Sequence, residues 1–354
     1  MTKDKGILIK NIYYMLTYAF QILRQSGYDE IAAEEFENIH DLFASILLKG
    51  IAKLIKQGIY RDYVTKCDNL SVLRGKLDIY GTIKNKYQRR QMLSCEYDEM
   101  SENNLFNQIL KTTATILQRQ SLVSEKHKKA LKKLMLFLNA VDIIEPSDIQ
   151  WNRLKFHRNN QHYKMLLNIC YFVLDGLLLS TEKGKYKMAT FLDEQHMSRL
   201  FEKFVLEYYR YHYPKLHAAS SQIAWNVDDV IIDYLPIMKT DITLRFGEKI
   251  LIIDTKYYSR TMQIQNQYDS QTLHSNNLYQ IFTYVKNLDV RSSGIVAGMI
   301  LYAKTEEIIT PDYDFLMSGN KISVKTLDLS ISFPNIAAQL DRYATSYFGD
   351  TKSK

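Results

Sequence analysis

The sequence predicts an α/β (α+β) protein in two parts: a mainly helical amino-terminal domain with some strand structure, then a mixed sheet flanked by helices. The chain has 354 residues, which is long for one core. Apolar residues recur at helical spacing through the first half, whereas the second half contains apolar, strand-like runs. The polar stretch 182–185 contains a glycine, so the predicted domains are 1–184 and 185–354.

The first half should consist mostly of helices. Ser101 and Ser124 are suitable N-caps for two of them. The segment 64–80 is turn-rich and is expected to be extended. Helical spacing of apolar residues predicts helices over 11–20, 42–59, 101–120, 124–139 and 160–179.

The second half should begin with a helix from Asp193 that buries one apolar stripe. The order helix, three strands, helix, strand then predicts a mixed sheet with helices on its faces. The expected helices cover 193–211, 276–288 and 335–347, and the expected strands cover 228–235, 240–246, 250–256, 295–302, 312–317 and 322–328.

Composition narrows the kind of partner. The formal net charge of +7 and the isoelectric point near 8.9 favour a polyanion. Three widely spaced cysteines suggest neither a disulfide framework nor a zinc knuckle, so we expect a cytoplasmic protein. No signal-type segment begins the sequence, and its most apolar stretch is too short to cross a bilayer, so no membrane role is expected.

Two strand-like runs carry the candidate catalytic residues. A short turn should fold 240–245 and 250–256 into a hairpin, which would bring Asp241 across from Asp254. Strand alternation points Asp254 and Lys256 to the same face. Two carboxylates could hold Mg²⁺, with Mn²⁺ as an alternative, and the lysine could orient a water. This set suits phosphodiester hydrolysis, although charged residues also end strands simply because strand ends meet water.

Several blocks of the sequence resemble one known family. The spaced Asp and Asp-x-Lys pattern is similar to the PD-(D/E)xK nuclease motif. The run Leu235-Pro236-x-Met238-x-Thr240-Asp241, with Asp254-Thr255-Lys256, resembles McrC, the nuclease subunit of McrBC restriction systems. Gln280-x-x-x-Tyr284 resembles the helix motif of RecB-like members of the superfamily, and 11–20 resembles the opening of McrC proteins.

The resemblance implies a role for each candidate site residue. Asp241, Asp254 and the backbone carbonyl of Thr255 would bind Mg²⁺, and Lys256 would position the attacking water. Gln280 and Tyr284 lie one helical turn apart and would support the centre or contact DNA. Some superfamily members carry a further acidic ligand on the helix where Glu202 stands.

The same resemblance implies partners. McrC proteins work with McrB, an AAA+ GTPase hexamer, on double-stranded DNA containing 5-methylcytosine. Their amino-terminal region stimulates that GTPase, and Arg74 is a candidate contact for it. The sequence contains no G-x-x-x-x-G-K-[ST] pattern, so we expect this chain to bind no nucleotide itself.

Two other functions remain open from the sequence. One is a stand-alone RecB-like DNA nuclease in repair or defence. The other is a non-catalytic docking subunit that only activates its GTPase.

Overall fold

The computed structural model describes residues 3–4, 6–20, 31, 34–158, 160–176, 178–182, 185–188, 193–228, 234–258, 262–265, 270–304 and 310–352. The chain forms two compact units. One combines residues 1–42 with 189–354, and the other comprises residues 43–188. The mixed α/β character expected from the sequence is confirmed, but the division differs from the expected boundary at residue 184, since the first 42 residues belong with the carboxy-terminal part.

Long-range contacts of the first helix explain this difference. Helix α1 (Ile9–Ala19) packs against α8 (Glu194–His212). The buried side chain of Asn11 donates to the backbone oxygens of Leu329 and Ile331, at 2.8 and 2.7 Å. Tyr18 bonds His212 at 2.8 Å. The helix therefore completes the core of the unit formed mainly by the carboxy-terminal half.

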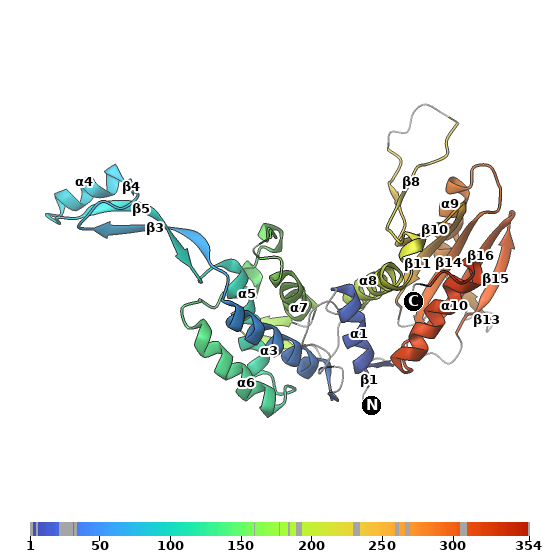
Figure 1. Cartoon of the computed structure of the whole chain (residues 1–354), viewed down its shortest axis with the longest axis horizontal. Helices are drawn as coiled ribbons and strands as arrows, with labels where there is room; N and C mark the ends of the chain where they lie inside the picture. Colours follow the sequence, from blue (N-terminus) through green and yellow to red (C-terminus); the bar gives the residue numbers. More distant parts are fainter. Residues whose placement is uncertain are drawn as a thin grey trace. The chain divides into compact units, whose positions relative to one another are not determined.

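The centre of that unit is a five-stranded mixed sheet (Figure 1). Its strand order is β10-β11-β14-β16-β15. The central pairs β11–β14 and β14–β16 are parallel, whereas β10–β11 and β15–β16 are antiparallel. The sheet strands are β10 (Ile242–Phe246), β11 (Lys249–Lys256), β14 (Val296–Lys304), β15 (Tyr313–Met317) and β16 (Asn320–Asp328).

Helices cover both faces of this sheet. Helix α9 (Ser275–Leu288) packs on the face that carries Ile252, Ile300 and Val324. A Cβ on Gly298 would lie 2.6 Å from Ile281 of α9, so this glycine permits the close approach of helix and strand. Helix α10 (Phe333–Phe348) packs against β16 on the opposite face and contacts α8, whose Tyr209 hydroxyl donates to a backbone oxygen of α10.

The described part of this unit contains three shorter strand pairs. One of the strands predicted from the sequence, over 228–235, differs from what the structure shows. β8 and β9 form an antiparallel pair directly before β10. The expected strand over 228–235 includes residues 229–233, which lie outside the described residues, and residues 228, 234 and 235 are not in a strand. The pairs are β1 (Lys3–Asp4) with β2 (Ile7–Leu8), β8 (Gln222–Ile223) with β9 (Met238–Lys239), and β12 (Met262–Gln265) with β13 (Ser270–Leu273).

The second unit is mainly helical, as expected. Ser124 caps its helix by accepting from the His127 N–H, as predicted. The prediction that Ser101 starts a helix is wrong, because Ser101 is the last residue of the strand β5 (Leu93–Ser101) and Asn104 is the N-cap of the helix. The helices are α3 (Ile39–Gln57), α4 (Ile79–Tyr87), α5 (Leu105–Arg119), α6 (Glu125–Met135) and α7 (Tyr163–Gly176).

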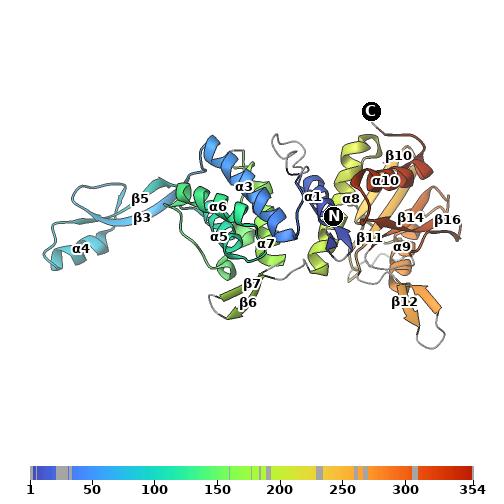
Figure 2. The same cartoon turned by 90° about the horizontal axis from the view of Figure 1, so that it is seen from below.

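A small β-layer extends from the helices of this unit (Figures 1 and 2). Its strands pair in the order β3-β5-β4, all antiparallel, and α4 packs against β5. We call this part the β-finger, residues 62–101. The strands are β3 (Asp62–Leu70), β4 (Lys76–Leu77) and β5 (Leu93–Ser101), and a further hairpin joins β6 (Leu178–Glu182) to β7 (Lys185–Met188).

Candidate catalytic site

The β10–β11 hairpin brings the two predicted carboxylates together. Strand register pairs Ile242 with Ile253 at the end of the ladder, with Asp241 directly before Ile242 and Asp254 directly after Ile253. The turn between the strands is short because Gly247 adopts a φ of 57°, which favours glycine. Asp254 stands on the face that α9 covers, and Asp241 is close enough for its charge to contribute to raising the pKa of Asp254.

Asp254 is a buried carboxylate with unfilled hydrogen-bonding capacity. Its side chain is only 1% exposed, and Lys256 Nζ lies 2.8 Å from Oδ2. Neither oxygen accepts a hydrogen bond of good geometry from any residue that the structure describes. Burial raises the pKa of Asp254 to about 6, against the opposing effect of Lys256. A buried carboxylate is costly to the fold unless it is paired or binds a metal, and Lys256 pairs with only one of these two oxygens.

Lys256 is held in its charged form at the same place. Burial lowers the pKa of Lys256, but the adjacent Asp254 carboxylate outweighs burial, and the net pKa is raised. The ammonium also donates to Gln280 Oε1 at 3.2 Å. It therefore remains a cation and proton donor rather than a general base in this arrangement.

The orientation of the Asp241 carboxylate is fixed by Thr255, the residue between Asp254 and Lys256. One oxygen, Oδ2, accepts from the Thr255 N–H at 2.8 Å and from the Thr255 hydroxyl at 2.9 Å. Two donors on one oxygen set the orientation of the carboxylate and leave Oδ1 for another ligand.

The predicted helix motif is linked to Lys256 by a chain of hydrogen bonds. Gln280 Nε2 donates to the Tyr284 hydroxyl at 2.9 Å, and that hydroxyl donates to the Lys239 backbone oxygen at 3.1 Å. The amide and the phenol, one turn apart on α9, thus fix Lys256 relative to the segment that leads to Asp241. This chain is the main reason to regard Gln280 and Tyr284 as part of the centre.

Glu202 of α8 also faces the centre. Burial, together with the negative charges of Asp241 and Asp254, raises the pKa of Glu202 to about 7 against the opposing charges of Lys239 and Lys256. A glutamate in the middle of a helix is usually a surface group, whereas Glu202 is a third carboxylate close enough to interact with the other two.

The donor set suits Mg²⁺, which in proteins takes one or two carboxylates and completes its shell with water and substrate oxygens. Asp241 and Asp254 could supply those carboxylates. Within the described ranges, no three His, Cys, Asp or Glu side chains are close enough to enclose a metal by themselves.

A second polar network next to the centre was not predicted as part of it. Asn277 Nδ2 donates to the Tyr302 hydroxyl at 2.9 Å, and Tyr258 donates to Asn277 Oδ1 at 3.3 Å. Tyr302 is opposite Lys256 in the β11–β14 register, and burial, with a smaller contribution from the charge of Asp254, raises its pKa to about 12. Only the strand register, which single-sequence patterns do not give, could have revealed this neighbour.

Arg74 lies in the other unit, on the β-finger. Its guanidinium stacks on the Tyr97 ring, with Cζ 4.0 Å from the ring centroid. The side chain is 52% exposed and lies 3.7 Å from Glu99. Arg74 is therefore not grouped with the carboxylate centre by the structure.

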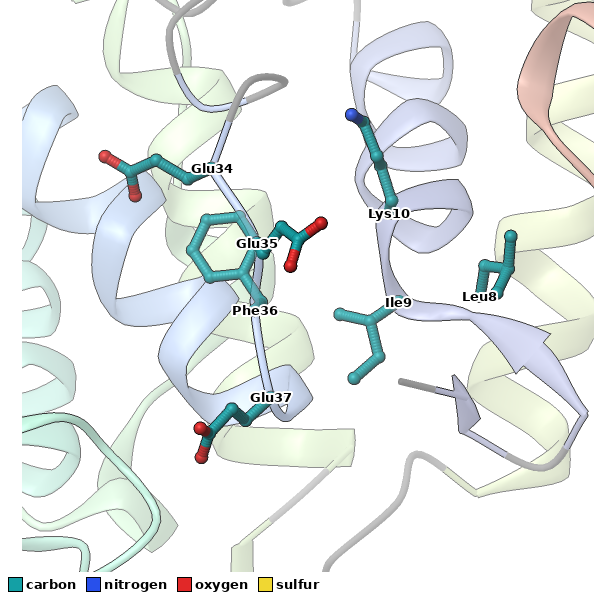
Figure 3. A pocket seen from close by; sticks show the side chains of 7 residues that line it. All are labelled: Leu8, Ile9, Lys10, Glu34, Glu35, Phe36 and Glu37. Carbon is teal, nitrogen blue, oxygen red and sulfur yellow. The ribbon is translucent and has the colours of Figure 1, made fainter. Parts of the chain in front are cut away.

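A separate pocket lies beside α1 (Figure 3). It has a volume of about 200 Å³ and contains none of the predicted site residues. Three of its lining residues are glutamates, which would repel a phosphate. The lining consists of Leu8, Ile9, Lys10, Glu34, Glu35, Phe36 and Glu37.

No helix in the described part of the chain is both long and apolar enough to span a bilayer.

A family model described as McrBC 5-methylcytosine restriction system component matches residues 3–303. The type IV methyl-directed restriction enzyme EcoKMcrBC of Escherichia coli strain K12 is 27% identical over 338 residues, covering 94% of this chain and 96% of that protein. A solved half-complex from a tetradecameric assembly of Thermococcus gammatolerans McrB AAA+ hexamers with bound McrC contains a similar chain. Its TM-score is 0.54 at 18% identity, covering 96% of this chain and 75% of that one, which shows the fold alone.

Proposed function

Because the chain belongs to the family of McrBC 5-methylcytosine restriction system components, we propose that it is the DNA endonuclease subunit of such a system. The observation that carries this proposal is the grouping of Asp241, Asp254 and Lys256 at one end of the β10–β11 hairpin. Their arrangement supports a PD-(D/E)xK centre that hydrolyses phosphodiester bonds with Mg²⁺.

The residues around Asp254 support the metal requirement. Among the described residues, Oδ1 of Asp254 has no hydrogen-bond donor and Oδ2 has the Lys256 ammonium beside it, so a divalent cation would use the remaining capacity of both oxygens. Asp241 and Asp254 would hold the ion, and the carbonyl of Thr255 is a further candidate ligand. When bound, Mg²⁺ would polarise the scissile phosphate and lower the pKa of a water.

Side chains of this protein would then orient the attacking water and stabilise the charge that develops during hydrolysis. Lys256, kept protonated by Asp254, would position the attacking water and offset charge that develops on the phosphate. Gln280 would restrict the ammonium to one direction through its 3.2 Å hydrogen bond. By analogy with the superfamily, the products would be a 5′-phosphate and a 3′-hydroxyl.

We assign partner engagement to the β-finger. The archaeal assembly named above contains McrB AAA+ hexamers with bound McrC, and this chain has a similar fold. The β-finger exposes an unusual number of apolar side chains, which mark a protein contact surface. They include Tyr63, Val72, Leu73, Ile79, Tyr80, Ile83, Tyr87, Met92 and Met100.

Arg74 would contribute to the same contact. Its guanidinium is held on Tyr97 yet half exposed, so it could still bind a carboxylate or phosphate of the GTPase. Partner stimulation should then depend on the β-finger and not on the carboxylate centre.

A cleavage assay tests the whole proposal. The full chain is incubated with its cognate AAA+ GTPase, GTP and Mg²⁺, using DNA with and without 5-methylcytosine. We expect cleavage only with the methylated DNA and the complete set of components. Cleavage by the chain alone would favour the stand-alone RecB-like nuclease, and GTPase stimulation without any cleavage would favour the docking subunit.

A pair of surface variants tests the partner assignment. Tyr80→Ser, on the β-finger, should reduce GTPase stimulation without changing the fold, because the side chain is 81% exposed. Leu136→Ser is the matched control, since Leu136 is 72% exposed in the same unit but outside the β-finger. Equal stimulation by both variants would refute the docking role of Tyr80.

A further inference from the structure

A stripe of exposed side chains leads directly to the catalytic carboxylates. In the extended segment before β10, Leu235, Ile237 and Lys239 are exposed, whereas Met238 and Thr240 are buried. Pro236 is exposed as well, so the alternation begins at Ile237, and from there the exposed side reaches the partly exposed Asp241. Two aliphatic side chains and a cation thus end at the proposed metal ligand.

The stripe is held firmly in place from behind. Met238 belongs to the core cluster under α9. The Lys239 backbone oxygen accepts from Tyr284, and the Thr240 hydroxyl binds Ser221. These contacts fix the backbone, so exposure of the stripe is a property of the folded unit.

A hydrogen bond from Trp225 fixes the end of the stripe that lies farther from Asp241. Trp225 Nε1 donates to the Pro236 oxygen at 2.6 Å, which ties the segment before β9 to the segment after β8. Ile237, in the middle, is nevertheless 76% exposed. An aliphatic side chain displayed on an anchored backbone indicates a contact surface more than a loose loop.

We propose that Leu235, Ile237 and Lys239 form a DNA-positioning edge of the catalytic centre. Lys239 would bind a backbone phosphate next to the scissile one, and the aliphatic pair would pack against the deoxyribose walls of the minor groove. This proposal rests on the proposed nuclease function and adds the surface that positions its duplex.

The position and charge of the edge identify duplex DNA as the occupant. Lys239 and Asp241 are two residues apart in the chain, within about 7 Å, so a duplex whose phosphate reaches Asp241 would lie close to Lys239. The Lys239 charge also counteracts the carboxylate of Glu202, which would otherwise repel the DNA backbone beside the centre.

Duplex binding by the full chain tests this edge directly. Affinity for a fluorescent duplex is measured by anisotropy with Ca²⁺ in place of Mg²⁺, over a series of salt concentrations. Lys239→Gln should lower the slope of log K against log salt by about 0.9, the loss of one phosphate contact. Ile237→Ser should weaken binding about tenfold at every salt concentration.

Matched controls exist in the same unit. Leu316 is 79% exposed on β15, at the sheet edge opposite β10, and Lys215 is exposed after α8. Leu316→Ser and Lys215→Gln should bind as the wild type does. Equal affinities for all four variants, or no duplex binding by the wild type, would overturn the proposal.

Oligomeric state and Mg²⁺-dependent cleavage are two further readouts on the same variants. If Ile237→Ser changes the oligomeric state in size-exclusion chromatography and leaves DNA affinity unchanged, the surface is an interface between chains and the proposal fails. If the edge variants lose affinity as expected while wild type never cleaves DNA in Mg²⁺, the nuclease function fails and the edge stands. Wild-type cleavage with unchanged variant affinities would refute the edge alone.

Discussion

Thr255 donates both its backbone N–H and its hydroxyl to one oxygen of Asp241. The end of the hairpin that carries the proposed centre is thus held together by side-chain hydrogen bonds as well as by the ladder of the two strands. The free oxygen of Asp241 then has a defined direction. Thr255 consequently orders the proposed metal ligand, whatever its own carbonyl binds.

This relationship predicts the effect of a nearly isosteric change. Thr255→Val removes the hydroxyl bond and retains the backbone one, so we expect Mn²⁺ affinity, measured by calorimetry, to fall about tenfold. Thr255→Ser retains the hydroxyl and should bind nearly as wild type does. If Val and Ser bind the metal equally, the hydroxyl does not order Asp241.

Gln280 should affect the chemical step rather than substrate binding. Gln280→Ala removes the acceptor that directs Lys256, and we expect kcat to fall about tenfold with KM within about twofold. Steady-state cleavage with the complete system measures both constants. A change confined to KM would instead indicate that Gln280 contacts DNA.

Asn11 should stabilise the carboxy-terminal unit although it lies near the start of the chain. Asn11→Ala leaves the Leu329 and Ile331 oxygens without their donor, and we expect a loss of about 2–3 kcal/mol of unfolding free energy. Chemical denaturation followed by far-UV circular dichroism measures it. Asn11→Asp, which cannot donate, should lose at least as much, and an unaffected Asp variant would contradict this role.

Asp289, which lies outside the proposed catalytic centre, should make the stability of the folded protein depend on pH. Although burial opposes it, hydrogen bonds from Asn320, Ser293 and Gly294 lower the Asp289 pKa to about 2. Since the folded-state pKa is below the unfolded one, the stabilisation is present above about pH 4 and is lost as pH falls towards about 2.

The matching experiment compares unfolding of wild type and Asp289→Asn. The variant should be about 2 kcal/mol less stable at neutral pH, and this difference should shrink in acid because the wild type loses its own charge. A difference that stays constant down to about pH 2 would show that the carboxylate charge is not responsible.

Local sequence signals predicted the elements of the sheet unit well. The Asp193 cap begins α8 as expected, since its side chain accepts from the His196 N–H. The short turn at Gly247 sets the register that pairs Ile242 with Ile253 and so brings Asp241 near Asp254. These features depend on residues close in sequence, which is why they could be predicted.

Contacts between distant segments could not be predicted in the same way. The apolar stripe of α8 must be buried, but its pattern does not specify that α1, about two hundred residues earlier, covers it. Likewise, the strand register that places Tyr302 opposite Lys256 depends on a parallel pair formed across α9. The candidate residues of the centre could therefore be predicted from the sequence, whereas many of the long-range contacts that hold them in place could not.

The most direct test of the catalytic centre is DNA cleavage by Asp254→Asn in the complete system with GTPase, GTP and Mg²⁺. Removing the buried carboxylate charge should reduce the cleavage rate by about 10³-fold or more, while stimulation of the partner's GTPase stays at the wild-type level. Cleavage at the wild-type rate would contradict the assignment of Asp254, and with it the proposed centre.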